Sequence, residues 1–174
     1  MSRGSLPFQE TSLRVFIGRI SLPEYLKRWE MVTVENEREV RINDFAQWGQ
    51  LLEDTVQISL NDNFRQLLGE DRVLSKYAVP AQGIWKLDFD FLSFTGNEQG
   101  FFRVKAYCKA SDEKQKKFFT IAFDLPYEAG KPEELVKAHE EALSRFVQEV
   151  AGKLMEAAEQ EKPCSVTGDT KTGL

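Results

Sequence analysis

A segment in the second half of the chain, "GIWKLDFDFLSFTGNEQGFFRVKAYCKASDEKQKKFFTIAFDLPYE", alternates apolar and polar residues through three successive runs. Two polar stretches, Thr95–Gly100 and Ser111–Lys116, separate the runs and predict turns. Alternation with a period of two places every second side chain on one face of a sheet. The segment therefore predicts a three-stranded antiparallel meander with one buried face. The expected cross-strand neighbours are Phe91 with Val104, Phe89 with Ala106 and Leu87 with Cys108, then Cys108 with Phe119, Ala106 with Ile121, Val104 with Phe123 and Phe102 with Leu125.

The other face of this meander is charged. Opposite charges on facing residues stabilise a strand pair, so we expect Asp90 opposite Lys105 and Arg103 opposite Asp124. The pattern predicts a solvent-facing surface bearing ion pairs. Its residues are Lys86, Asp88, Asp90, Arg103, Lys105, Lys109 and Asp124.

The middle strand of the meander has small residues on its buried face: Ala106, Cys108 and Ala110. Larger residues flank them, so the predicted sheet has a shallow trough in which a helix can lie. The last apolar pattern of the chain supplies that helix, with Pro132 suited to its first turn. Its apolar positions recur at helical spacing: Leu135, Ala138, Ala142, Phe146, Val150 and Leu154.

The first half of the chain adds further elements. Val15–Ile20 reads as a strand, and "MVTVENEREVRI" reads as a hairpin that pairs Val34 with Val40 and Val32 with Ile42. A helix is expected over Asp44–Leu68, begun by a capping box of Asp44 and Gln47 and ended by Gly69. Its expected apolar positions are Trp48, Leu52, Thr55, Val56, Leu60, Phe64 and Leu67. "RVLSKY" is a short strand candidate.

These elements predict a single α/β domain over residues 13–158, with a mainly antiparallel sheet, two long helices and a small N-terminal hairpin. A chain of 174 residues is long enough for one domain with a substantial core. We expect residues 1–12 to be disordered or artificially added, and residues 159–174 to be a disordered tail.

Composition excludes several classes of function. The net charge of −5 argues against a nucleic-acid partner, because a phosphate backbone requires a basic surface. No apolar run reaches the ~20 residues that span a bilayer, and no signal peptide is visible. The two cysteines, Cys108 and Cys164, fit one buried and one exposed thiol better than a disulfide or a metal site.

The sequence offers little catalytic chemistry. His139 is the only histidine, and a lone histidine near an apolar stripe is usually structural. Asp88 and Asp90 share one strand face and could serve as an acid–base pair, but an ion-paired surface is the better interpretation. We therefore expect no enzyme activity, no metal and no cofactor.

The segment "ISLPEYLKRWEMV" places five large apolar side chains in an expected loop: Leu22, Pro23, Tyr25, Leu26 and Trp29. One interpretation is a short turn that closes one end of the core. The other is an exposed patch for a partner protein, and both can hold if the side chains divide between inside and outside. The 13 phenylalanines likewise fit either a packed core or a lipid-lined groove.

Two stretches resemble the PqiC-type ABC-transporter auxiliary lipoproteins of Gram-negative bacteria: "ISLPEYLKRWEMV" and "FAQWGQLLEDTVQISLNDNFRQLLGEDRV". The later "WKLDFDFLSF" also fits the family pattern, and the resemblance covers roughly Leu13–Met155. The matching residues are Leu22, Pro23, Tyr25, Leu26 and Arg28 in the first stretch, and Trp48, Leu60, Leu67, Leu68, Gly69, Arg72 and Val73 in the second.

The resemblance implies a periplasmic lipoprotein, held on the inner leaflet of the outer membrane by a lipid on an N-terminal cysteine. That cysteine and its signal peptide are absent here, and we expect them to have been removed. The implied partner is a transporter subunit with a mammalian-cell-entry (MCE) domain, in a system that moves lipids between the two membranes. The implied fold is α/β, with a mixed sheet of about five strands.

Two functions therefore remain: a non-enzymatic accessory subunit, or a carrier that holds an acyl chain beneath the phenylalanine-rich sheet. For the first, the expected partner-binding residues are Leu22, Pro23, Tyr25, Leu26, Arg28, Trp29 and Trp48. Self-association through the loop or the sheet edges stays open.

Overall fold

The computed structural model describes residues 13–36, 39–74 and 83–161. Their core is a mixed five-stranded sheet in the order β4-β1-β5-β6-β7, beside a separate β2–β3 hairpin. The predicted α/β fold, with its mixed sheet, two long helices and hairpin, is confirmed. The elements are β1 (Arg14–Ser21), η2 (Glu24–Leu26), β2 (Glu30–Asn36), β3 (Glu39–Gln47), α1 (Leu52–Leu68), η3 (Glu70–Arg72), β4 (Val73–Leu74), β5 (Ile84–Gly96), β6 (Phe101–Ser111), β7 (Lys116–Pro126) and α2 (Pro132–Glu161).

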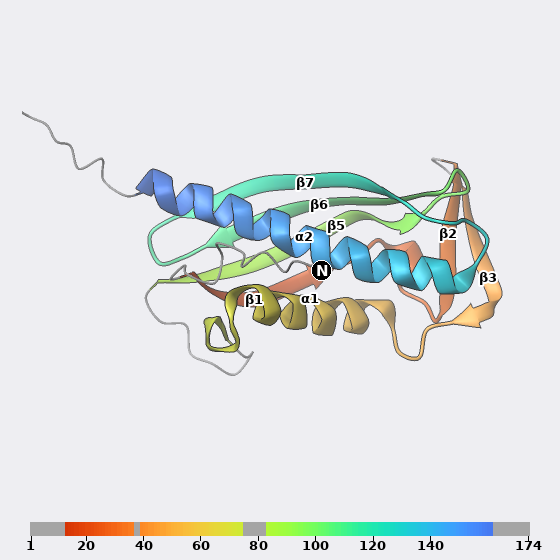
Figure 1. The fold of residues 1–174 in the computed structure, drawn as a ribbon, viewed down its shortest axis with the longest axis horizontal. Coiled ribbons are helices and arrows are strands. Elements are labelled where there is room, and N and C mark those ends of the chain that lie inside the picture. Colours follow the sequence, from red (N-terminus) through yellow and green to blue (C-terminus); the bar gives the residue numbers. More distant parts are fainter. Residues whose placement is uncertain (1–12, 37–38, 75–82, 162–174) are drawn as a thin grey trace, which may run out of the picture.

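Both long helices lie on one face of the sheet, as Figure 1 shows. β1 runs parallel to β4 and β5, whereas β5, β6 and β7 form the predicted antiparallel meander. The predicted segment 1–12 lies outside the described residues. So does most of the predicted tail, although α2 continues to Glu161.

The expected trough is present on the inner face. Ala106, Cys108 and Ala110 are buried on β6, and α2 packs over the sheet. Phe146 of α2 lies 5.1 Å from the Phe89 ring and 5.0 Å from the Phe91 ring, measured between centroids. All six predicted apolar positions of α2 are buried. Small side chains on the middle strand thus allow the aromatic side chain of the helix to approach the sheet.

The register of the second meander turn is as predicted, with Cys108 opposite Phe119 and Phe102 opposite Leu125. The predicted register of the first turn is wrong by two residues. Phe91 faces Ala106 rather than Val104, and the other pairs shift likewise. As a result Asp90 faces Tyr107 rather than Lys105, whereas the predicted Arg103–Asp124 ion pair forms at 3.1 Å.

The strands pair closer to the turn than predicted, with Gly96 opposite Phe102, and a β-bulge between Phe91 and Ser93 then changes the register by one residue. The inward positions of β5 are odd-numbered up to Phe91 and even-numbered from Phe94. One additional residue, Leu92, is needed to keep both sets of phenylalanines on the buried face. The bulge therefore changes the register without exposing the core.

The expected start of the first long helix is wrong. β3 continues through Asp44 to Gln47, and α1 begins only at Leu52, with no side-chain cap at its start. From Leu52 onward the predicted apolar positions are buried except Thr55, which is partly exposed, and Gly69 ends the helix with a positive φ of 107°. The hairpin pairs Val34 with Val40 and Val32 with Ile42, as predicted. In the "RVLSKY" candidate, Arg72 ends η3 and Val73–Leu74 form β4, whereas its last three residues lie outside the described residues.

Candidate interaction surface at the hairpin end

The apolar loop after β1 divides its side chains between the core and the surface. Leu22 and Leu26 are buried in the main hydrophobic cluster. The turn η2 holds them there, with the Leu26 amide donating to the Pro23 carbonyl at 3.0 Å. For these two leucines the structure supports the interpretation of a plug at one end of the core.

The remaining side chains of this loop reach solvent to different degrees. Pro23, Tyr25 and Arg28 are partly buried, and burial raises the pKa of the Tyr25 hydroxyl. Trp29 is 51% exposed although it follows the buried part of the loop directly. An indole with half its surface in water is a typical anchor for a partner protein.

Trp48 connects this loop to α2. Its amide donates to the Trp29 carbonyl at 2.8 Å, and its ring packs edge-on against the His139 ring at 4.9 Å. The prediction that Trp48 lies within a helix is wrong, because it lies in the segment between β3 and α1. Trp29 and Trp48 are therefore held together, one half-exposed and the other half-buried.

His139 has a structural environment. Its ring is buried between Trp48, Phe94 and Phe102, and its Nδ1 lies 2.8 Å from the Leu135 carbonyl oxygen. Burial lowers the pKa of His139 to about 4, and the backbone hydrogen bond offsets only part of this effect. The ring is consequently neutral at physiological pH.

The hairpin presents a second group of apolar side chains, which the sequence interpretation missed. Val40 is 43% exposed, Ile42 is 37% exposed and Phe45 is fully exposed. Phe45 lies in a bulge, because Met31 pairs with Asn43 while Glu30 pairs with Gln47. The prediction of a helix from Asp44 onward concealed the exposed Phe45 in β3. Phe45 does not fit the apolar stripe of that predicted helix, and this misfit was the sequence signal that the segment is not helical.

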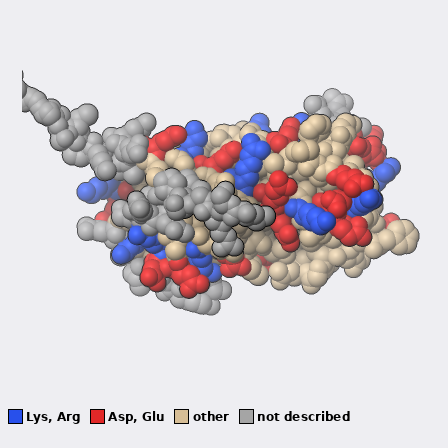
Figure 2. Space-filling model, viewed as in Figure 1, with Lys and Arg blue, Asp and Glu red and all other residues tan. Residues whose placement is uncertain are grey.

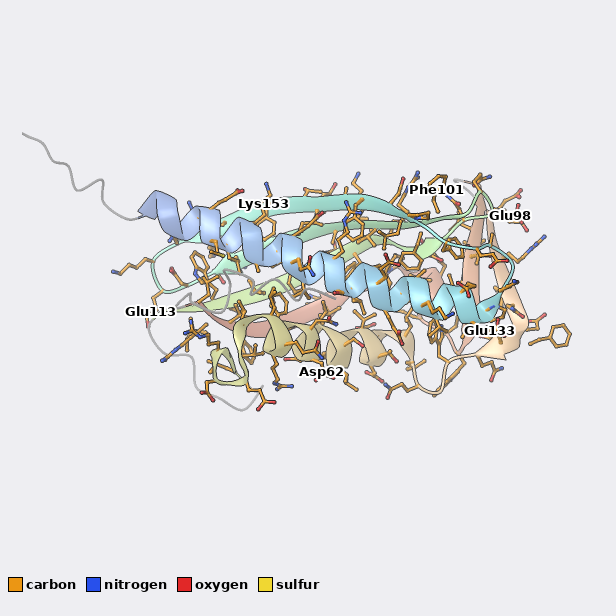
Figure 3. The ribbon with its side chains drawn as sticks, in the orientation of Figure 1. Asp62, Glu98, Phe101, Glu113, Glu133 and Lys153 are labelled. Atoms are coloured by element: carbon orange, nitrogen blue, oxygen red, sulfur yellow. The ribbon has the colours of Figure 1, made fainter. Side chains whose placement is uncertain are left out.

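An open cleft of about 610 Å³ lies beside the hairpin. Figure 3 labels Glu98, next to the tips of β2 and β3, and Glu133, at the beginning of α2. Arg41 forms ion pairs in this region with Glu35 at 2.7 Å and Glu98 at 3.3 Å. The lining residues come from the hairpin (Met31, Thr33, Arg41, Ile42, Asn43, Asp44 and Phe45), the β5–β6 turn (Asn97 and Glu98), and the start of α2 with its preceding loop (Tyr127, Ala129, Gly130, Lys131, Pro132 and Leu135).

The candidate acid–base pair does not form a reaction centre. The Asp88 carboxylate accepts a hydrogen bond from the Arg19 amide at 2.7 Å and so holds a bulge in β1. Burial raises the pKa of the Cys108 thiol to about 12, which leaves it protonated and a poor nucleophile. Cys164 lies outside the described residues. No group of three potential metal ligands gathers among the side chains that the structure describes.

Across the described ranges, no helix has both the length and the apolar character needed to cross a membrane.

Two solved structures share the fold. A crystal structure described as an uncharacterized protein superposes with a TM-score of 0.72 at 16% identity, covering 81% of this chain and 92% of that one. Protein XCC0632 from Xanthomonas campestris, of the DUF330 family, superposes with a TM-score of 0.69 at 17% identity, covering 90% and 91%. The comparison with curated proteins found no match.

The sequence itself matches a family described as the ABC-type transport auxiliary lipoprotein component, over residues 2–151. This match covers most of the 174 residues and includes both stretches that resemble PqiC-type proteins. The chain therefore belongs to the ABC-type transport auxiliary lipoproteins.

Proposed function

We propose that this protein is a non-enzymatic accessory subunit of an MCE-type ABC transporter that moves lipids between the inner and outer membranes. It acts in the periplasm, held on the inner leaflet of the outer membrane by a lipid anchor, and supports envelope integrity. Membership of the auxiliary lipoprotein family supports this role. The partner is the MCE-domain subunit of the same transporter.

The observation that carries the proposal is the apolar surface formed by Trp29, Val40, Ile42 and Phe45, which we call the hairpin patch. These side chains are at least one-third exposed, and all belong to the hairpin or to the residue that precedes it. Ile42 and Phe45 line the cleft, Val40 lies nearer the hairpin tip and Trp29 lies at its base. Exposed apolar residues along one element are typical of protein-binding surfaces. Aromatic residues at such surfaces contribute most of the binding energy.

The residues expected from the sequence then take two roles. Pro23, Tyr25 and Arg28 lie partly exposed beside Trp29 in the chain and contact the partner with it. Leu22 and Leu26 are buried, and Trp48 is half-buried against His139, so these three hold the contacting segment in place. Replacing a contacting residue should weaken binding, whereas replacing a holding residue should also weaken the fold.

The test is the affinity of the protein for the purified periplasmic part of its MCE-domain subunit, measured by biolayer interferometry. Trp29→Ala and Phe45→Ala should each weaken binding about 30-fold, the effect of losing ~2 kcal/mol at a central anchor. Ile58→Ala is the matched control, because Ile58 is also about half exposed but lies on α1. Undiminished affinity in both hairpin-patch variants would exclude this surface as the contact.

The alternative of an acyl-chain carrier finds less support. It requires space beneath the phenylalanine-rich sheet, yet the rings there contact one another. Phe91 lies 5.3 Å from Phe94, and Phe94 lies 5.1 Å from Phe102, between ring centroids. The rings themselves occupy the volume in which an acyl chain would have to lie. The carrier function would be supported if mass spectrometry detected a stoichiometric amount of lipid in protein purified from a native membrane.

A further inference from the structure

The face of the five-stranded sheet that points away from α1 and α2, here called the outer face, is basic. The alternation of buried and exposed residues along β1, β5, β6 and β7 shows which side chains lie on this face. Seven of these side chains are basic and three are acidic. The chain as a whole has the opposite sign, with a net charge of −5. The basic residues are Arg14, Arg19, Lys86, Arg103, Lys105, Lys109 and Lys116, and the acidic ones are Asp88, Asp90 and Asp124.

The two long helices carry more acidic than basic side chains. The described side chains of α1 and α2 include nine acidic and four basic residues. Figure 2 shows this side of the molecule, where acidic side chains gather around the start of α2. The sheet therefore separates a basic surface from an acidic one, and the outer face is suited to an anionic partner.

Internal ion pairs neutralise only part of the outer face. Arg103 is paired with Asp124 at 3.1 Å, and the Asp88 carboxylate is bound to the Arg19 amide. Lys105 and Lys109 lie on the same side of β6 with Tyr107 between them, and Lys109 faces Asp88 on β5. Neither lysine forms an ion pair or hydrogen bond within the described part of the chain. Their ammonium groups are available to an external anion.

Two aromatic residues project from the same surface. Tyr107 lies between these lysines on β6 and is 51% exposed, and Phe118 on β7 is 74% exposed. Phe118 pairs with Lys109, so the two rings are diagonal neighbours across the strands. Together with Arg19 and Asp90 they border a shallow hollow of about 350 Å³. Aromatic rings among lysines are typical of surfaces that rest at the boundary between lipid headgroups and acyl chains.

We propose that the outer face rests on an anionic phospholipid membrane, with Lys105 and Lys109 at the lipid phosphates and Tyr107 and Phe118 inserted between headgroups. Charge complementarity selects an anionic partner. The aromatic rings favour a lipid surface over an acidic protein, and a lipoprotein works beside a membrane. Such contact orients the domain on the bilayer and leaves the hairpin patch free. It does not depend on the MCE-type partner.

The experiment is flotation of residues 1–174, prepared without lipid modification, with vesicles of equal parts phosphatidylglycerol and phosphatidylethanolamine, against vesicles of phosphatidylcholine. We expect binding to the anionic vesicles at low salt, loss of binding at about 0.5 M salt, and little binding to phosphatidylcholine. The double variant Lys105→Glu, Lys109→Glu should lower the partition constant about tenfold or more. Tyr107→Ser with Phe118→Ser should also lower it, and circular dichroism checks that both variants are folded.

The matched control is Lys137→Glu with Lys153→Glu, which makes the same change of net charge on α2. Its partition constant should equal that of the unmodified chain. Equal losses in the two charge-reversal variants would overturn the proposal, because net charge alone would then explain binding. Absence of binding to anionic vesicles would also overturn it. Loss of self-association in the Lys105→Glu, Lys109→Glu variant, without vesicle binding, would instead assign the outer face to contacts between copies.

Discussion

The inner face of the meander and the β2–β3 hairpin use the same kind of antiparallel pairing but end in opposite environments. On the inner face, α2 covers the alternating apolar side chains, and Phe146 is completely buried among phenylalanine rings. On the hairpin, β3 forms one edge of a two-stranded sheet, and Phe45 is fully exposed. The same residue type thus supports the core in one region and forms a surface in the other.

This difference separates stability from binding. Covering a sheet face removes apolar area from water and is the main source of folding free energy. An uncovered apolar edge contributes almost nothing to folding, so its residues can be replaced without loss of stability. Substitutions in the two regions should therefore have different effects. Those on the inner face should lower the stability of the fold, and those on the hairpin should weaken binding to the partner.

The largest effect is expected from one substitution made in both regions. Phe146→Ala should lower the free energy of unfolding by about 3–5 kcal/mol, because it leaves a cavity between α2 and the sheet. Phe45→Ala should change it by less than about 0.5 kcal/mol, since its ring makes no buried contact. Urea denaturation followed by circular dichroism measures both. Similar losses in the two variants would refute the distinction between the regions.

Acidification should destabilise the helix-covered side by titrating His139. In the unfolded chain its pKa is close to 6.5, but in the fold it is about 4, so the unfolded state binds the proton first. Stability from this group is complete above about pH 6.5 and falls as the pH drops toward 4. The loss at that point is about 3 kcal/mol.

The measurement compares urea denaturation of the unmodified protein and His139→Gln between about pH 7 and pH 4. Carboxylates titrate in both proteins, so the difference in slope isolates the histidine. A variant with the same pH dependence as the unmodified protein would show that the ring stays accessible to protons.

The two regions also differ in how far the sequence predicts them. The inner face was predictable because alternation in β6 and β7 fixes which side chains are buried, and the observed register of that pair agrees. The register of β5 against β6 was not, because it depends on how close to the turn the strands pair and on a bulge at Leu92. The change of inward positions from Phe91 to Phe94 was a visible signal of that bulge.

The hairpin end was predicted less well. Asp44 and Gln47 have the spacing of a capping box, but pairing of Asn43 with Met31 and of Gln47 with Glu30 keeps this segment in β3. Tertiary contacts here override a local helix signal. The loop residues expected to bind a partner divide between core and surface, and spacing alone does not determine that division. The cleft beside the hairpin joins segments far apart in sequence, so no local pattern predicts it.

Overfilling the trough under α2 should give an intermediate effect. Ala106→Leu adds a branched side chain where the helix approaches β6, and should cost about 1–3 kcal/mol of unfolding free energy. Ala122→Leu on β7 is the matched control, because Ala122 is exposed on the outer face. Thermal denaturation should show a clear drop in Tm for the first and almost none for the second. Equal melting temperatures would indicate that α2 can move away from the sheet.

The smallest expected effect concerns one hydrogen bond between the hairpin and the meander. The buried Thr95 hydroxyl of β5 donates to the Val32 carbonyl of β2 at 2.7 Å. Thr95→Val keeps the shape of the side chain but leaves that carbonyl without this donor, which should cost about 1 kcal/mol. The loss should be local, so amide hydrogen exchange should accelerate in β2 and β3 and stay unchanged in β6 and β7. Faster exchange throughout the sheet would mean that the hairpin and the meander unfold as one cooperative unit. The two regions would then differ in binding but not in stability.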